Sequence, residues 1–336
     1  MRKLLVHTGV YICVAVGVMM FHLVHLSMKN YTPDFVTRRG TFSHADVKPA
    51  GTTDAAEKFW LTVHNQSGFS VECGLLIPRR SGQRFPAVIV LGGKDTGKNA
   101  VDFVFDIDEV IVAAPDYGYQ PKPKYSIPEF LADVPDIRRA LLDMVPAVML
   151  LTDYLAQRPD VDTTKLVLVG YSFGAPFVPA ILRLDRRFDA AFIVYGGGEL
   201  KGLIRHNVRR YHGPLAAEMM GWMGKLLLAP LEPMRSISAV APIPLVMING
   251  TEDEQIPLEN AEQLFDAARE PKKMIWLESK HVHPRNLALT RTIIRTLRDE
   301  LVRLGILPAS RHEQGQSPSA SSRRLLLDSG EVPHEL

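Results

Sequence analysis

Lys165-Leu166-Val167-Leu168-Val169-Gly170-Tyr171-Ser172-Phe173-Gly174 is the stretch that decides the fold of this chain of 336 residues. Its first half is a short apolar run, which predicts a strand buried on both faces. The second half is a Gly-x-Ser-x-Gly pattern, whose glycines leave room for a serine to project from a tight turn between a strand and a helix. Because this pattern also arises by chance, its meaning depends on the residues that follow downstream.

Two later segments place an acid and a histidine just after further strands. The run Pro244–Ile248 predicts a buried strand and leads into a polar turn that carries Asp253. The run Lys273–Leu277 predicts another strand, and His281 and His283 follow it. A histidine in that position can reach back over the edge of a sheet. The chain thus presents a serine, an acid and a histidine in this order, each close to the end of a predicted strand.

With these residues the chain resembles the α/β-hydrolases, and more narrowly the dienelactone-hydrolase and acyl-esterase-like branch, over roughly residues 58–305. The resemblance rests on Gly170–Gly174, on the block Asn249–Pro257 and on Phe85–Gly93, which looks like the strand and oxyanion loop of that family. It implies an α/β fold with a doubly wound, mostly parallel sheet.

The resemblance also implies a Ser-Asp-His catalytic triad. Ser172 would be the nucleophile, and a histidine would accept its proton. Asp253 would orient that histidine. The neighbouring Glu252 and Glu254 are acidic alternatives, but the place of Asp253 within its block matches the family pattern.

Two residues compete for the role of the histidine. His281 stands only a few residues past the predicted strand and is preferred, with His283 as the alternative. The catalytic histidine of the family often follows a glycine, whereas Ser279-Lys280 precede His281 here. This departure leaves the choice between the two histidines open.

An oxyanion hole needs two converging hydrogen-bond donors. The backbone N–H of Phe173, one residue past the nucleophile, is the first candidate. Gly93 or Lys94, in the loop after Leu91, would supply the second through a backbone N–H. Many members of the family carry His-Gly at this loop. This chain has Gly92-Gly93 instead, which still provides backbone donors.

Short apolar runs separated by longer amphipathic segments predict that strands alternate with helices in a domain over residues 58–307. Two β-rich runs around Asn65–Gly68 predict an antiparallel hairpin at the edge of the sheet. Residues 199–240 interrupt the alternation before the strand that carries the acid, so a cap over the site and an ordinary core helix are both open. The predicted strands of the alternating part are Ala87–Leu91, Glu109–Ala113, Leu166–Val169, Ala190–Tyr195, Leu245–Ile248 and Met274–Leu277.

The N-terminus predicts a membrane segment. Arg2 and Lys3 precede the apolar run Leu4–Leu26, which is long enough to cross a hydrocarbon core of about 30 Å as a helix. Residues 1–27 are therefore expected to form an uncleaved single-pass anchor, with a cleaved signal sequence and secretion as the alternative. Positive charge before the anchor favours a catalytic domain in the periplasm or exterior. Residues 28–57 are expected to form a linker, and residues 308–336 a disordered tail.

The composition of the chain limits the classes of partner and cofactor that we expect. The chain has 39 basic and 37 acidic residues and a net charge of +2, so nothing indicates a nucleic-acid partner. Cys13 and Cys73 are not expected to pair, and His64 falls in no metal-ligand spacing. We expect a serine hydrolase that cleaves an ester or related acyl bond of a small molecule through an acyl-Ser172 intermediate, without cofactor or metal. The alternatives are a peptidase or acyltransferase on the same fold, or a catalytically silent scaffold.

Overall fold

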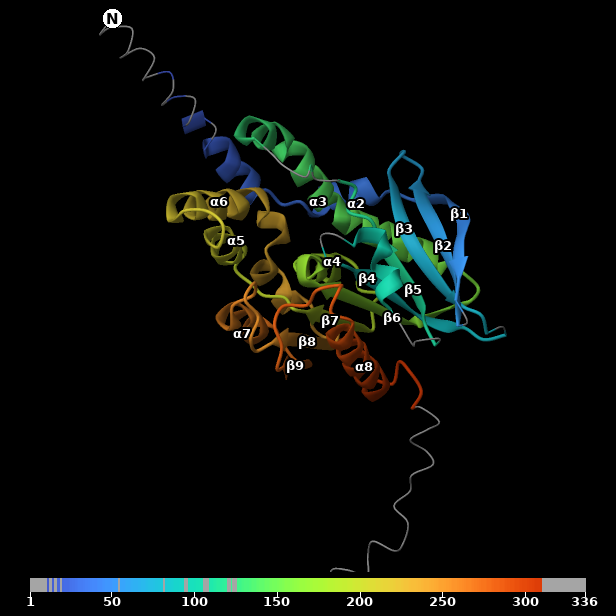
Figure 1. The fold of residues 1–336 in the computed structure, drawn as a ribbon. Helices are drawn as coiled ribbons and strands as arrows, with labels where there is room; N and C mark the ends of the chain where they lie inside the picture. Colours follow the sequence, from blue (N-terminus) through green and yellow to red (C-terminus); the bar gives the residue numbers. More distant parts are fainter. Residues whose placement is uncertain are drawn as a thin grey trace, which may run out of the picture.

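The computed structural model describes most of the chain, and its strands form a single sheet (Figure 1). The sheet has nine strands within the described residues, in the order β1-β2-β3-β5-β4-β6-β7-β8-β9. The residues that the structure describes are 11, 14, 17–18, 20–53, 55–80, 82–93, 96–104, 109–119, 122 and 126–309, without the side chain of residue 127.

The strands from β5 to β9 in this order run parallel to one another, as expected of a doubly wound sheet. Most of their residues are buried, because helices cover both faces. All six predicted strands are confirmed. Their bounds are β4 (Phe85–Leu91), β5 (Ile111–Pro115), β6 (Val161–Tyr171), β7 (Ala190–Val194), β8 (Leu245–Gly250) and β9 (Lys272–Leu277).

The other end of the sheet is antiparallel. Strands β2 (Ala56–Asn65) and β3 (Ser70–Pro78) form the predicted hairpin, and β3 pairs antiparallel with β5. The hairpin does not form the edge, however. Strand β1 (Phe42–Thr52) pairs with β2 and lies outside it.

The predicted linker over residues 28–57 is therefore wrong. This stretch contains β1 and the helix α2 (Thr32–Arg39), and Phe35 of α2 belongs to the hydrophobic core. Arg39 binds Asp153 of the long helix α3 through its Nε, at 2.7 Å from Oδ2. The sequence conceals β1 because an edge strand is largely solvated, so most of its side chains are exposed and show no apolar alternation.

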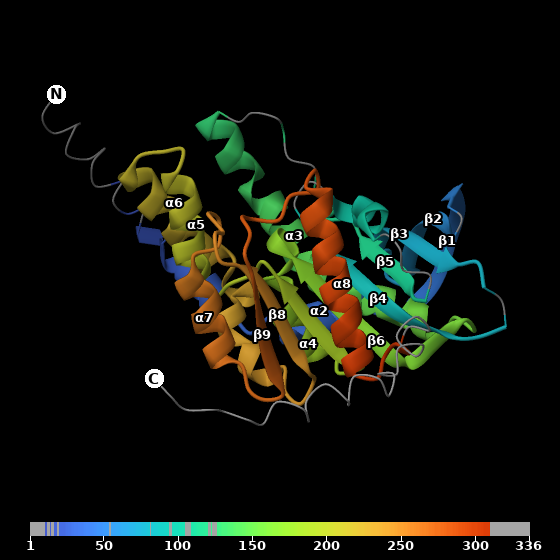
Figure 2. The same ribbon diagram turned by 60° about the horizontal axis from the view of Figure 1, so that its bottom comes forward.

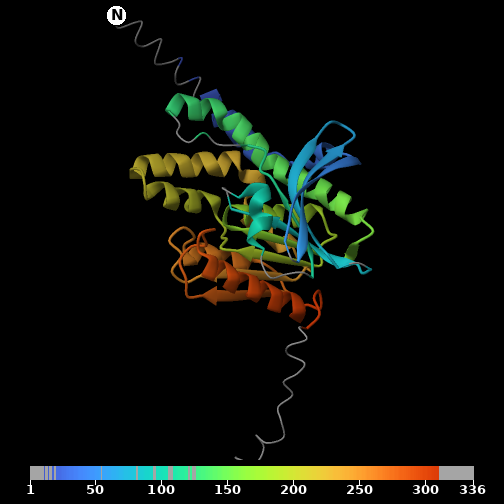
Figure 3. The same ribbon diagram turned by 45° about the vertical axis from the view of Figure 1, so that its right-hand side comes forward.

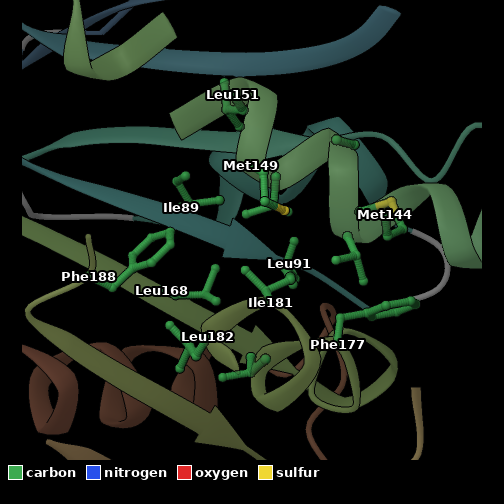
Figure 4. Close-up of a cluster of buried hydrophobic side chains, with 14 of the residues drawn as sticks. Ile89, Leu91, Met144, Met149, Leu151, Leu168, Phe177, Ile181, Leu182 and Phe188 are labelled. Atoms are coloured by element: carbon green, nitrogen blue, oxygen red, sulfur yellow. The ribbon is translucent and has the colours of Figure 1, made fainter. Parts of the chain in front are cut away.

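Helices cover both faces of the sheet. On one face α3 (Ile127–Ala156), α4 (Phe177–Leu184) and α7 (Leu258–Ala267) share a core cluster with residues of the strands, part of which Figure 4 shows. On the other face α8 (Leu287–Arg303) crosses the strands (Figure 2), and the 3-10 segment η1 (Gly97–Phe103) packs beside it in a second cluster. The parallel strands are thus buried from both sides, and their C-terminal ends open onto the loops that carry the predicted site.

Residues 199–240 form a helical insertion between β7 and β8. The insertion consists of α5 (Leu200–Arg209), α6 (Pro214–Leu227) and three short 3-10 segments. The two helices lie side by side and project from one end of the molecule (Figures 1 and 3). An inserted helical element was expected here, and its function as a cap stays a prediction.

Parts of two predicted terminal segments fall outside the described residues. Within the part of the chain that the structure describes, no helix is both long and apolar enough to cross a bilayer. Much of the predicted anchor Leu4–Leu26 lies outside that part, as do residues 310–336 of the predicted tail.

Candidate active site

Ser172 occupies a strained turn directly after β6. Its φ is +48°, a left-handed conformation that is uncommon for a residue with a side chain. The turn demands glycine on both sides. A Cβ at Gly174 would lie 2.1 Å from the carbonyl oxygen of Leu91, and one at Gly170 would lie 2.6 Å from Val178 of α4. The turn approaches β4, and the end of β6 approaches α4, this closely only because both positions lack a side chain.

The structure brings Ser172, His281 and Asp253 together from three loops. Nε2 of His281 lies 2.7 Å from Oγ of Ser172, and Nδ1 lies 2.7 Å from Oδ2 of Asp253. The side chains of His281 and Asp253 are 6% and 1% exposed. A carboxylate can only accept a hydrogen bond, so Nδ1 carries the proton of the neutral ring. Nε2 is then free to accept the Ser172 hydroxyl proton.

The turn around Asp253 fixes the direction of its carboxylate. Oδ1 accepts hydrogen bonds from the backbone N–H groups of Gln255 at 2.7 Å and of Ile256 at 3.0 Å. The other oxygen is left for the imidazole. Of the two acidic alternatives, Glu252 is exposed, and Glu254 lies against the backbone of the histidine loop rather than its ring.

Glu254 supports the backbone of His281. Its Oε2 accepts a hydrogen bond from the backbone N–H of His281 at 3.3 Å. Hydrogen bonds from its own backbone N–H and from that of His281 lower the pKa of the Glu254 carboxyl. The charged side chain thus helps to hold the histidine loop against the acid loop.

His283 is turned away from this group. Its side chain is exposed, and its Nδ1 accepts a hydrogen bond from the backbone N–H of Arg285 at 3.1 Å. Of the two histidines that the sequence left open, His281 is therefore the one whose ring contacts Ser172.

The predicted oxyanion donors lie on neighbouring strand ends. Strand β4 pairs with β6 in a register that sets Leu91 beside Gly170. Gly93 lies just after the end of β4, and Phe173 lies just after the end of the adjacent β6. This neighbourhood is compatible with two converging backbone N–H groups. Lys94, the other candidate, lies outside the described residues.

Tyr117, just after β5, supports the oxyanion loop and escaped the sequence analysis. Its hydroxyl donates a hydrogen bond to the carbonyl oxygen of Gly92, and its ring packs edge-on against Phe173 with 5.0 Å between centroids. Burial raises the pKa of Tyr117, so the hydroxyl keeps its proton. The side chain links the two segments that carry the predicted oxyanion donors.

Tyr195, the residue after β7, supports the histidine loop and was also missed. It has a φ of +55° and is fully buried. Its hydroxyl is hydrogen-bonded to Oγ of Ser279, two residues before His281. Burial, together with the charge of Asp253, raises the pKa of Tyr195 against the opposing effect of the Ser279 bond. An aromatic residue at the end of an apolar run gives no sequence signal for this function.

Comparisons with known proteins show that part of the sequence and the fold resemble those of hydrolases. Residues 143–286 match the model of the prolyl oligopeptidase family. Two solved structures share the fold over most of their length. The acetyl xylan esterase from Paenibacillus sp. R4 aligns with a TM-score of 0.59 at 15% identity, over 79% of this chain and 93% of the esterase. The chain therefore has the α/β-hydrolase fold and is similar to members of that superfamily.

Acetyl xylan esterase 1 from Thermoanaerobacterium sp. JW/SL YS485 shares this fold, with a TM-score of 0.58 at 14% identity over 80% of this chain and 94% of the esterase. The uncharacterized protein YfhR is similar in sequence, with 31% identity over 126 residues for the protein of Salmonella typhi and over 127 residues for that of Escherichia coli K12. The match with the Salmonella protein spans 37% of this chain and 42% of the relative. These comparisons support a hydrolase of the serine type.

The helical insertion at residues 199–240 binds the acid loop. Nε2 of His206 lies 2.9 Å from the backbone carbonyl oxygen of Glu254. The side-chain amide of Asn207 donates a hydrogen bond to the backbone carbonyl oxygen of Gln255 at 2.8 Å. Nη1 of Arg210 also donates to the Glu254 carbonyl at 3.2 Å. The C-terminal end of α5 therefore contacts the loop that holds Asp253.

Proposed function

We propose that this protein is a serine hydrolase that cleaves an ester or related acyl bond of a small molecule through an acyl-Ser172 intermediate. The observation that carries the proposal is the unbroken line of short contacts from Ser172 through His281 to Asp253. A serine is a weak nucleophile at neutral pH unless an adjacent base removes its proton. A largely buried imidazole, oriented by a carboxylate, supplies such a base.

In the proposed reaction Oγ of Ser172 forms a bond to the acyl carbon while its proton moves to Nε2 of His281. The positive charge that develops on the ring is stabilised by Asp253. The backbone N–H groups of Phe173 and Gly93 are the proposed donors to the tetrahedral oxyanion. His281 then returns the proton to the leaving group. Water repeats the sequence on the acyl-enzyme and releases the acid.

Two leaving-group chemistries remain to be separated by experiment. The two solved structures compared above are acetyl xylan esterases, whereas the family model is that of prolyl oligopeptidases. Esters and peptides would pass through the same acyl-enzyme. A panel of p-nitrophenyl acyl esters and matched acyl-peptide anilides distinguishes an esterase from a peptidase, and alcohol acceptors added to the assay reveal an acyltransferase.

A fluorophosphonate probe tests the central claim, because it labels activated serines irrespective of the substrate. We expect the full-length protein to be labelled and Ser172→Ala not to be. The matched control Ser70→Ala, at an exposed position of β3, keeps Ser172 and should still be labelled. Labelling that persists in Ser172→Ala would assign the reaction to another serine. An unlabelled parent protein would favour the catalytically silent scaffold.

We also propose, from the sequence, that Leu4–Leu26 anchors the protein in a membrane with the catalytic domain in the periplasm or exterior. Such an anchor keeps the protein with membranes during high-salt washes, because burial of an apolar helix does not depend on screened charge. A soluble mature form that begins near Ser27 would replace the anchor by a cleaved signal. Protease added outside a sealed inner membrane should digest the domain, and full protection would reverse the orientation.

A further inference from the structure

A cluster of two imidazoles and a carboxylate lies on the antiparallel end of the sheet, away from the proposed active site. It consists of His44 and Asp46 of β1 and His64 of β2, and the potential ligand atoms of the three side chains all lie within 4.8 Å of one another. From this arrangement we infer that His44, Asp46 and His64 bind a divalent transition-metal ion of the zinc class.

The pairing of the two strands creates the cluster. The register of β1 and β2 sets His44 directly opposite His64, and Asp46 lies two residues further along β1. Alternation places these three side chains on one face of the sheet. The intervening Ala45 pairs with Val63, which is fully buried in the core on the other face. The outward direction of the three side chains is thus fixed by the core beneath them.

The distances suit a tetrahedral ion after small side-chain rotations. Ligand atoms about 2.0–2.1 Å from zinc lie roughly 3.3 Å apart in a tetrahedron. Nε2 of His64 is already 3.2 Å from Oδ2 of Asp46. The two imidazoles are nearly parallel, with 4.6 Å between their centroids and 10° between their planes. His44 and Asp46 are exposed, so their side chains are free to close the remaining gap.

The donor chemistry selects the class of ion. Two imidazole nitrogens and one carboxylate oxygen are a ligand set of zinc and of its neighbours nickel and copper, whereas magnesium and calcium prefer oxygen alone. Nδ1 of His44 lies 3.2 Å from the hydroxyl of Ser43, which leaves Nε2 for the ion. Such an outer hydrogen bond orients a ligating imidazole and sets its tautomer.

The cluster is distinct from the proposed active site. In the sheet order β1 stands five strands away from β6, which carries Ser172, or about 24 Å at the usual spacing of strands. An ion here would join the edge strand β1 to β2. It would therefore stabilise this end of the sheet without touching the reacting groups.

The sequence could not reveal this site. His44 and His64 are far apart along the chain, because one lies near the start of β1 and the other near the end of β2. His64 falls in no local ligand spacing, so a metal site was not expected. Cross-strand ligands become neighbours only when the register of the hairpin is known.

Zinc titration of the full-length protein in detergent tests the inference. We expect isothermal titration calorimetry to show zinc binding that requires all three residues, and zinc to raise the unfolding midpoint by several degrees. We expect each of three substitutions to weaken zinc binding by at least about tenfold: His44→Gln, Asp46→Asn and His64→Gln. The loss of a hydrogen-bond partner of a metal ligand already weakens metal binding this much, and the loss of a ligand should cost more. Magnesium should produce neither effect.

His212→Gln is the matched control, since it removes another exposed histidine, located after α5. It should bind zinc as the parent protein does. Unfolding midpoints without metal show whether each variant is folded, and the isosteric Asp46→Asn keeps the test valid if a histidine variant fails to fold. Zinc binding that survives in all three variants, or equal loss in His212→Gln, would overturn the inference, as would a parent protein that does not bind zinc.

Discussion

The ring of Tyr195 packs edge-to-face against the imidazole of His281, with 5.6 Å between the centroids and 87° between the planes. The Tyr195 hydroxyl is also hydrogen-bonded to Ser279 of the same loop. One buried side chain therefore contacts the histidine ring and braces the backbone segment that leads to it. The contact is made from a strained backbone position, since Tyr195 directly follows β7 with a φ of +55°.

Tyr195→Phe should lower kcat by about threefold to tenfold and leave KM nearly unchanged. The ring contact survives in this variant, but the hydroxyl bond, worth about 0.5–1.5 kcal/mol, is lost from the histidine loop. Steady-state kinetics on an ester substrate measure the effect. Tyr211→Phe removes an exposed hydroxyl and serves as the control. A change confined to KM would mean that Tyr195 does not act through His281.

His281→Ala should lower the rate of acyl transfer by several orders of magnitude, because Ser172 loses its proton acceptor. His283→Ala should retain most of the activity, since that side chain is exposed and turned away from Ser172. Fluorophosphonate labelling rates and ester hydrolysis report both effects. An inactive but folded His283→Ala beside an active His281→Ala would exchange the two assignments.

Asp253→Asn should reduce kcat by about four orders of magnitude, as expected when the orienting carboxylate of a triad is lost. The amide can donate a hydrogen bond to Nδ1, so it favours the ring tautomer that cannot accept the Ser172 proton. Glu252→Gln removes a neighbouring exposed charge and should be nearly neutral. Similar rates in the two variants would show that Asp253 is not the orienting acid.

Gly174→Ala should destabilise the protein strongly or prevent folding. The added Cβ would lie 2.1 Å from a backbone oxygen of Leu91 in β4, which no side-chain rotation can relieve. Gly213→Ala is the control, because a Cβ there would meet no described atom within 4 Å. Urea unfolding midpoints compare the two. Equal midpoints would show that the turn after β6 is not packed as closely as described.

Glu300 of α8 should contribute stability that is lost in acid. Burial opposes its ionisation, but hydrogen bonds from Lys273 and Arg303 outweigh that effect and lower its pKa. A lowered pKa stabilises the fold above the unfolded value of about 4.3, and this contribution disappears as the pH falls through the folded value. Glu300→Gln should therefore be less stable at pH 7 and lose less stability toward pH 3. Glu259→Gln, at an exposed position, should follow the parent curve.

The parallel half of the sheet was predictable because strands buried on both faces read as continuous apolar runs. Glycines around Ser172 signalled the turn, and Asp253 followed a strand in the expected order. The edge strand β1 was not predictable, since most of its side chains face solvent. The same lack of pattern led the sequence analysis to treat α2, whose Phe35 is buried, as part of a linker.

The sequence by itself determined the order of the strands along the chain and the identity of the candidate nucleophile and acid, because these depend on local runs and turns. Only the tertiary structure decided that His281 rather than His283 contacts Ser172, and that Tyr117 and Tyr195 brace the two loops of the site. It also brought His44 and His64 together. The physical reason is that contacts between residues far apart in the chain depend on register and side-chain direction, which packing sets and no local pattern records.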